Sequence, residues 1–272
     1  MKLDAGTTTV HVGPTRVRVR IVGTGGHAAP PLLFLMGIGG NLDMWRPLVE
    51  WLPDRQLVMF DFPGTGGSSL SWLPPTMGYN AVFVKLLLLR LGLGRVDVLG
   101  YSWGGLLAQH LAIQHPRSVR RLVLAATTVG FGGIPPSPDV AARLLTPRRY
   151  YSRSYFRSVA PTIYGGRFRT DAAMLEDHAG RRLGRPPSPL GYAAQLAALT
   201  GYSTLPGLPF VHARTLVLAG DDDPIVSTLN PRLLAKALRR STLKIIPKAG
   251  HLLLVDSPEV VGPEIEQFLA AD

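Results

Sequence analysis

Short apolar blocks alternate with longer helix-forming segments along most of the chain. The first block alternates polar and β-branched residues over 16–21, which predicts a strand with one exposed face. The later blocks are apolar throughout, as is typical of parallel strands covered on both faces. Strands are predicted at 16–21, 32–36, 57–60, 96–99, 122–125, 216–219 and 243–246, and helices at 41–52, 80–91, 103–115, 230–240 and 257–270. The last helix is expected to begin at Pro258, with Ser257 as its N-cap. This alternation predicts a mostly parallel, doubly wound α/β sheet.

One segment interrupts the alternation. After the strand that ends near Thr128, the sequence becomes rich in Gly and Pro and is expected to stay irregular to about His212, apart from short helical stretches such as 190–199. Ligands of open α/β folds bind at the carboxyl ends of the strands. We therefore expect residues 130–212 to form a cap insertion over that edge, with 1–129 and 213–272 forming the core.

Composition narrows the chemistry that the chain can perform. The 272 residues are 46% hydrophobic and 17% charged, which suits a folded domain with a sizeable core. The chain has no cysteine, so disulfides, thiol nucleophiles and cysteine-ligated metals are excluded. The N-terminal residues lack the apolar segment of a secretion signal, and the apolar runs are too short for a membrane span. We expect a cytoplasmic protein with no membrane span.

The net charge of +11 is unevenly distributed. Residues 130–214 carry 11 Arg against four acidic residues. Such a segment can bind nucleic acid or another anionic surface. These arginines are scattered, however, and no nucleic-acid motif accompanies them. We interpret them mainly as a solvated face and expect no nucleic-acid partner.

A Gly-x-Ser-x-Gly motif lies where the strand at 96–99 meets the helix at 103–115. It reads GYSWG at residues 100–104. A tight turn between a strand and a helix holds the serine in a strained backbone conformation with its hydroxyl exposed, and only small residues fit at the two glycine positions. This context favours a nucleophilic Ser102 over a surface serine in a glycine-rich turn.

A serine hydroxyl needs a base, because it is barely ionised at neutral pH. His251 follows the last predicted strand, and an acidic run, GDDDP at 220–224, follows the strand before it. Asp223 is the preferred acid to orient His251, and Asp222 is the second candidate. The acidic run lacks the spacing of a calcium loop, so no metal is expected. The chain order Ser102, Asp223, His251 is typical of α/β-hydrolase triads.

Two backbone amides are candidates for an oxyanion hole. One is the amide of Trp103, directly after the serine, and the other is the amide of Ile38 in the GIGG loop at 37–40. Neither glycine-rich phosphate motif is present, so phosphate binding is disfavoured. Tyr164, Phe168, Tyr192 and Tyr202 are candidates to line an acyl pocket, although packing of the cap on the core explains them equally well.

Together these motifs resemble the α/β-hydrolase superfamily and, within it, the intracellular depolymerases of medium-chain poly(3-hydroxyalkanoates). The similarity runs from about residue 31 to 270 and is carried by GIGGNL at 37–42, DFPGTGGSS at 61–69, SWGG at 102–105, TPRRYYS at 146–152, APTIYGGRFR at 160–169, LVLAGDDDPIV at 216–226 and GHLLLV at 250–255. In that family the nucleophile, acid and base would fall on Ser102, Asp223 and His251. The resemblance implies a polyester of 3-hydroxy acids as substrate, reached at the surface of intracellular granules.

We therefore expect a serine ester hydrolase that needs neither a cofactor nor a metal. The basic cap, including Arg148 and Arg149, is a candidate for docking at a polyester granule. A small-molecule carboxylesterase or a carbon–carbon bond hydrolase on the same triad is the alternative. A ligand-binding protein that keeps the fold without catalysis is the rival from another class.

Overall fold

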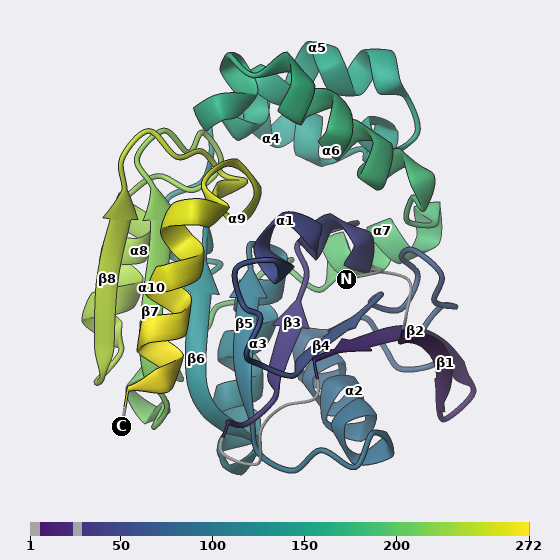
Figure 1. The fold of residues 1–272 in the computed structure, drawn as a ribbon, viewed down its shortest axis with the longest axis vertical. Coiled ribbons are helices and arrows are strands. Elements are labelled where there is room, and N and C mark those ends of the chain that lie inside the picture. The colour runs from purple at the N-terminus through teal and green to yellow at the C-terminus, as the bar shows by residue number, and fades with distance from the viewer. Residues whose placement is uncertain (1–5, 24–28, 272) are drawn as a thin grey trace.

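The computed structural model describes residues 6–23 and 29–271, which contain an eight-stranded sheet with the strand order β1-β2-β4-β3-β5-β6-β7-β8 (Figure 1). The strands are β1 (Thr7–Val12), β2 (Thr15–Val22), β3 (Leu32–Leu35), β4 (Leu57–Phe60), β5 (Val96–Tyr101), β6 (Val119–Ala125), β7 (Arg214–Gly220) and β8 (Ser241–Ile246). β2 is antiparallel to both β1 and β4, and the remaining neighbours are parallel. The predicted doubly wound α/β sheet is confirmed.

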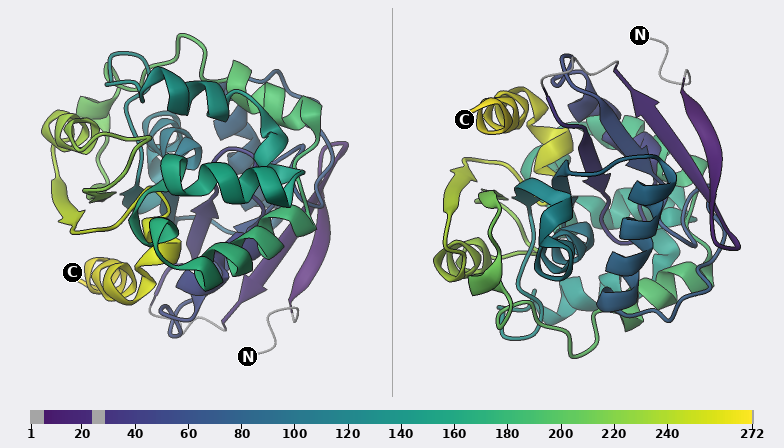
Figure 2. Two further views of the ribbon diagram at one scale, coloured as in Figure 1. Left: turned by 90° about the horizontal axis from the view of Figure 1, so that it is seen from above. Right: turned by 90° about the horizontal axis from the view of Figure 1, so that it is seen from below.

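Alternate residues of the central strands face two separate hydrophobic layers. Leu32 and Phe34 of β3 pack in one layer, whereas Leu33 and Leu35 pack in the other. The first layer includes α1 (Arg46–Val49), α9 (Leu253–Asp256) and α10 (Pro258–Ala270), and the second includes α2 (Met77–Arg90), α3 (Trp103–Gln114) and α8 (Leu229–Ala237). Helices therefore cover both faces, as uninterrupted apolar strands require (Figure 2).

Several predicted boundaries differ from the structure. The strand β1 was not expected, because its sequence TTTVHV is largely polar; it is an edge strand held by pairing with β2. The helix predicted at 41–52 is a 3₁₀ turn over Leu42–Trp45 followed by the single turn of α1. The last helix begins at Pro258 as predicted, but the Ser257 hydroxyl donates to Asp256 and does not cap it.

The segment expected to be largely irregular is mostly helical, and the helical stretch expected at 190–199 corresponds to the helix Pro189–Ala197. Between β6 and β7 it contains α4 (Pro138–Leu144), α5 (Arg153–Tyr164), α6 (Ala172–Gly184) and α7 (Pro189–Ala197), here called the cap helices, with 3₁₀ turns at Pro147–Tyr150, Gly166–Arg169 and Leu208–Phe210. Each cap helix starts at a Ser or Asp side chain that accepts a hydrogen bond from a backbone amide of its first turn. These N-cap hydrogen bonds stabilise the helices although the segment is rich in Gly and Pro.

The cap helices lie beyond the carboxyl ends of the parallel strands (Figure 1). Phe156, Ile163 and Phe168 belong to the same hydrophobic cluster as residues of β3 and α10. The cap helices are therefore held by an apolar interior that is continuous with the layer below. None of the helices within residues 6–23 and 29–271 is long and apolar enough to cross a membrane.

Candidate active site

Ser102 lies in the sharp turn between β5 and α3. Its backbone has φ 53° and ψ −118°, a strained conformation for a residue with a side chain. A Cβ at Gly100 would lie 2.5 Å from the Cβ of Ala108, and one at Gly104 would lie 2.1 Å from the carbonyl oxygen of Leu35. Both positions therefore require glycine, which is the physical basis of the motif.

The structure brings Ser102, His251 and Asp223 together from three separate loops. The Nε2 of His251 lies 3.0 Å from the Oγ of Ser102, and its Nδ1 lies 2.8 Å from Oδ2 of Asp223. The other carboxylate oxygen of Asp223 accepts hydrogen bonds from the amides of Ile225 and Val226, at 2.8 and 2.9 Å. The carboxylate is thereby fixed with one oxygen directed at the imidazole, the arrangement in which a histidine can take a proton from a serine.

Asp222, the second candidate acid, faces a different neighbour. Its carboxylate accepts two hydrogen bonds at 3.0 Å from the guanidinium of Arg169, and one at 2.7 Å from the amide of Gly166. The hydrogen bonds from Arg169 lower the pKa of Asp222 despite its partial burial. Asp222 therefore links the β7–α8 loop to the turn after α5, and Asp223 is the residue beside His251.

Ile38 and Trp103, whose amides are the candidate oxyanion donors, border the same cavity as Ser102. Trp103 is the first residue of α3, so its backbone N–H has no partner within the helix. It also lies at the N-terminal end of the helix, which carries the partial positive charge of the helix dipole. This end of the helix suits a developing negative charge, and the oxyanion hole formed by these two amides stays a prediction.

Residues of the cap helices and the adjoining 3₁₀ turn hold these two amides in place. The amide of Gly39 donates to Oε1 of Gln195 at 2.7 Å, and the indole Nε1 of Trp103 donates to the backbone oxygen of Gln195 at 2.9 Å. The Tyr150 hydroxyl donates to the backbone oxygen of Ile38. Gln195 and Tyr150 were missed by the sequence analysis, because neither lies in a recognisable motif and their partners are far away in the chain.

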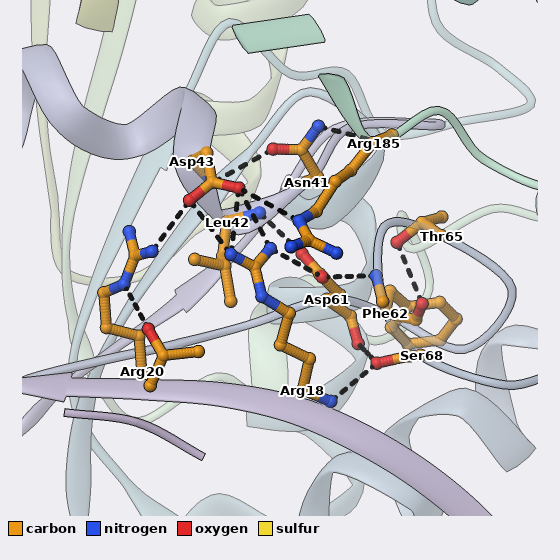
Figure 3. Close-up of polar contacts among 12 residues, drawn as sticks. Arg18, Arg20, Asn41, Leu42, Asp43, Asp61, Phe62, Thr65, Ser68 and Arg185 are labelled. Carbon is orange, nitrogen blue, oxygen red and sulfur yellow. Dashed lines mark hydrogen bonds and ion pairs between the residues drawn. The ribbon is translucent and has the colours of Figure 1, made fainter. Parts of the chain in front are cut away.

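Asp61 binds the end of the loop that contains Ile38, through the amide of Leu42 (Figure 3). It is fully buried and accepts hydrogen bonds from the amides of Leu42 and Gly67, both at 2.7 Å, and from Arg18 at 3.2 Å. Burial raises the pKa of Asp61 in spite of these donors. Asp43 in the same network binds Arg18. Asp61 therefore joins the Gly-rich turn that follows β4 to the neighbouring loop through Leu42.

Two cavities of different character border Ser102. The smaller, of about 60 Å³, is lined by Tyr101, Tyr150, Tyr164, Arg149, Arg182 and His251, among others. The larger, of about 580 Å³, is mostly apolar, with Leu106, Ile134, Leu144, Leu196, Leu199 and Val226 in its wall. Ser102 therefore borders both a small cavity that charged and aromatic side chains approach and a large apolar one.

The aromatic residues predicted to line an acyl pocket have different positions. Tyr164 lines the smaller cavity. Phe168 and Tyr192 line neither cavity: Phe168 packs against the rings of Tyr164 and His178, and the Tyr192 hydroxyl donates to the backbone oxygen of Leu144. For these two residues the packing interpretation is the better one.

The same holds for Tyr202, whose hydroxyl hydrogen bonds to the ring of His110. In the described part of the chain, no group of three or more His, Asp and Glu side chains is placed to hold a metal ion.

Comparison with known proteins relates this geometry to a family. Residues 30–258 match the family described as alpha/beta hydrolase fold. The chain is 42% identical over 240 residues to a poly(3-hydroxyalkanoate) depolymerase of Ectopseudomonas oleovorans, covering 88% of this chain and 84% of the relative. It is 26% identical over 241 residues to 3-oxoadipate enol-lactonase 2 of Acinetobacter baylyi, covering 88% of each. The crystal structure of the enol-lactonase from Burkholderia xenovorans LB400 superimposes with a TM-score of 0.83 at 22% identity, covering 97% of this chain and all of that one.

Proposed function

Because the chain belongs to the α/β-hydrolase fold family and is an ester hydrolase, we propose that Ser102, His251 and Asp223 are its catalytic triad and that it cleaves oligomers or polymers of medium-chain 3-hydroxy acids. The observation that carries the catalytic assignment is the pair of contacts made by His251, 3.0 Å to the serine and 2.8 Å to the carboxylate. The identity of 42% to a protein named as a poly(3-hydroxyalkanoate) depolymerase supports the substrate class.

The reaction follows from the positions of these groups. His251 Nε2 accepts the proton of Ser102 as Oγ forms a bond to the ester carbonyl carbon. The carbonyl oxygen becomes an oxyanion, which the amides of Ile38 and Trp103 stabilise. The imidazolium, paired with Asp223, then gives its proton to the alcohol oxygen as the carbon–oxygen bond breaks. Water repeats these steps with the same base and releases the acid.

The larger cavity supports an apolar acyl group. It borders Ser102, and its wall is mostly apolar. Each methylene removed from water contributes about 0.8 kcal/mol, which is roughly a fourfold gain in kcat/KM when the group is buried in the transition state. We therefore expect kcat/KM to rise from butanoate to octanoate esters.

Exposed apolar side chains at the mouth of this cavity support access from a polymer surface. Phe131 is 76% exposed and Leu145 is 68% exposed, and both also line the cavity. Such side chains can contact an amorphous polyester while the chain end enters the site. Arg148 is exposed and remains available for a granule, but Arg149 is buried and cannot contact one, which corrects that part of the docking expectation.

The decisive experiment compares the wild type with Ser102→Ala. The substrates are a medium-chain polyhydroxyalkanoate latex and p-nitrophenyl esters of four to eight carbons. Release of 3-hydroxy acids by the wild type alone supports both the nucleophile and the substrate class. Hydrolysis of the small esters without release from the latex favours a small-molecule carboxylesterase. Full activity of Ser102→Ala would contradict the assigned triad, and inactivity of the wild type on every ester would favour a ligand-binding role.

A further inference from the structure

Two arginines beside the proposed triad are buried without a carboxylate partner. Arg149 follows α4 and is 1% exposed, and Arg182 lies on α6 and is 2% exposed. Both line the smaller cavity together with Ser102 and His251. Among the described residues, no Asp or Glu forms an ion pair with either guanidinium.

The two guanidinium groups differ in how their donors are used. Arg149 donates to the hydroxyls of Tyr164 and Tyr192, at 3.2 and 2.8 Å, and to the backbone oxygen of Thr146 at 3.0 Å. Arg182 has one polar partner, Nε2 of His178 at 3.1 Å. Its Nε and Nη1 atoms are buried and hydrogen bond to no described residue. Arg182 therefore retains donors that the protein itself does not use.

The surroundings of Arg182 supply no negative charge. The rings of Tyr150, Phe156 and Tyr164 lie 4.6 to 5.2 Å from its guanidinium carbon. Burial, together with the positive charge of Arg182, holds the pKa of His178 well below its usual value, so this imidazole is neutral and accepts a hydrogen bond. Cation–π contacts with aromatic rings offset only part of the free-energy cost of burying a cation. A buried, unpaired charge is costly, and an anion that enters the cavity would offset that cost.

We propose that Arg182, supported by Arg149, binds the terminal carboxylate of the substrate, an inference that rests on the proposed oligoester substrate. The larger, apolar cavity suits the acyl side of the cleaved bond, and the cavity of about 60 Å³, which Arg149 and Arg182 border, has room only for a small group. In a chain of 3-hydroxy acids the free carboxylate is separated from the last ester oxygen by two carbons. A carboxylate held at Arg182 therefore presents the last ester bond to Ser102, and the enzyme releases monomers from the carboxyl end.

The test compares two substrates that differ in one charge. The first is the linear dimer of (R)-3-hydroxyoctanoic acid, and the second is the methyl ester of that dimer. The wild type should cleave the free acid with at least a tenfold higher kcat/KM. Arg182→Met should lower kcat/KM for the free acid by roughly 10- to 100-fold, because hydrogen bonds between charged groups are stronger than those between neutral groups. The same substitution should change kcat/KM for the methyl ester by less than threefold. Arg182→Lys should restore part of the preference.

Three controls separate this proposal from others. Arg153→Met removes a positive charge from α5, where the side chain is 48% exposed, and should behave as the wild type. p-Nitrophenyl octanoate carries no carboxylate, so its hydrolysis reports on the triad alone. Arg182→Met should keep the melting temperature of the wild type or raise it, since an apolar side chain replaces an unpaired cation among aromatic rings.

The same site can be tested without turnover. Ser102→Ala should bind (R)-3-hydroxyoctanoate in calorimetry, and Ser102→Ala with Arg182→Met should bind it at least tenfold more weakly. Equal cleavage of the free acid and the methyl ester by the wild type would overturn the carboxylate site. So would an equal loss on both dimers in Arg182→Met, which would indicate a structural role. Absence of p-nitrophenyl octanoate hydrolysis would contradict the proposed function itself.

Discussion

Gln195 connects the two amides of the proposed oxyanion hole. Its side-chain oxygen accepts from the amide of Gly39, next to Ile38, and its backbone oxygen accepts from the indole of Trp103. Gln195→Met keeps the length of the side chain and leaves the backbone oxygen in place. The substitution therefore removes the acceptor for Gly39 and disturbs little else.

The size of the effect follows from the lost hydrogen bond. The bond is buried and 2.7 Å long, so the amide of Gly39 would lose its partner away from water, which costs about 1–3 kcal/mol. The loop at 37–40 can relieve this cost only by moving, and Ile38 moves with it. Complete loss of an oxyanion donor lowers kcat by about 100- to 1,000-fold. For a displaced donor we expect kcat to fall by roughly 10- to 100-fold, with KM changing less than threefold.

The assay is steady-state hydrolysis of p-nitrophenyl octanoate, with kcat and KM determined separately. Urea unfolding of each variant establishes that the assayed protein is folded. Gln267→Met, an identical change at an exposed position of α10, is the matched control. An unchanged kcat in Gln195→Met, or a rise in KM at constant kcat, would refute the role of Gln195 in positioning the oxyanion hole.

Three further predictions concern the turn at Ser102, the larger cavity and the cap helices. Gly104→Ala should abolish soluble expression or lower the free energy of unfolding by several kcal/mol in urea titrations, because its Cβ would lie 2.1 Å from the backbone oxygen of Leu35. Leu196→Trp should narrow the larger cavity and lower the ratio of octanoate to butanoate kcat/KM by about fourfold for each methylene excluded. His178 stays neutral when folded but binds a proton near pH 6.5 when unfolded, so its contribution to stability is present above that pH and is lost below it. Between pH 6.5 and 5, the unfolding free energy of the wild type should fall relative to that of His178→Gln by about 1.4 kcal/mol per pH unit; parallel curves would contradict a neutral His178.

Local patterns in the sequence were sufficient to predict the strands at the core of the fold. The strands from β3 onward are each built around a short, mostly apolar run, and the two glycines around Ser102 are required by close contacts of their backbone. β1 gave no such signal, because an edge strand is held by backbone pairing and needs no apolar face. α7 was expected at 190–199, whereas α4, α5 and α6 were not, because Gly and Pro lie both between these helices and within them, as Pro161 does in α5 and Gly180 in α6.

The sequence by itself determined the fold class and indicated the chain order of the proposed nucleophile, acid and base, since each of these residues follows a predicted strand. Only the tertiary structure decided which carboxylate meets His251: Asp222 and Asp223 are adjacent in the chain, but one faces Arg169 and the other the imidazole. It also placed Gln195 and Arg182 at the site. Gln195 meets Gly39 across 156 positions of the chain, and Arg182 borders the smaller cavity only because α6 packs over the strand ends. Contacts of this kind arise from packing between distant segments, and no local pattern encodes them.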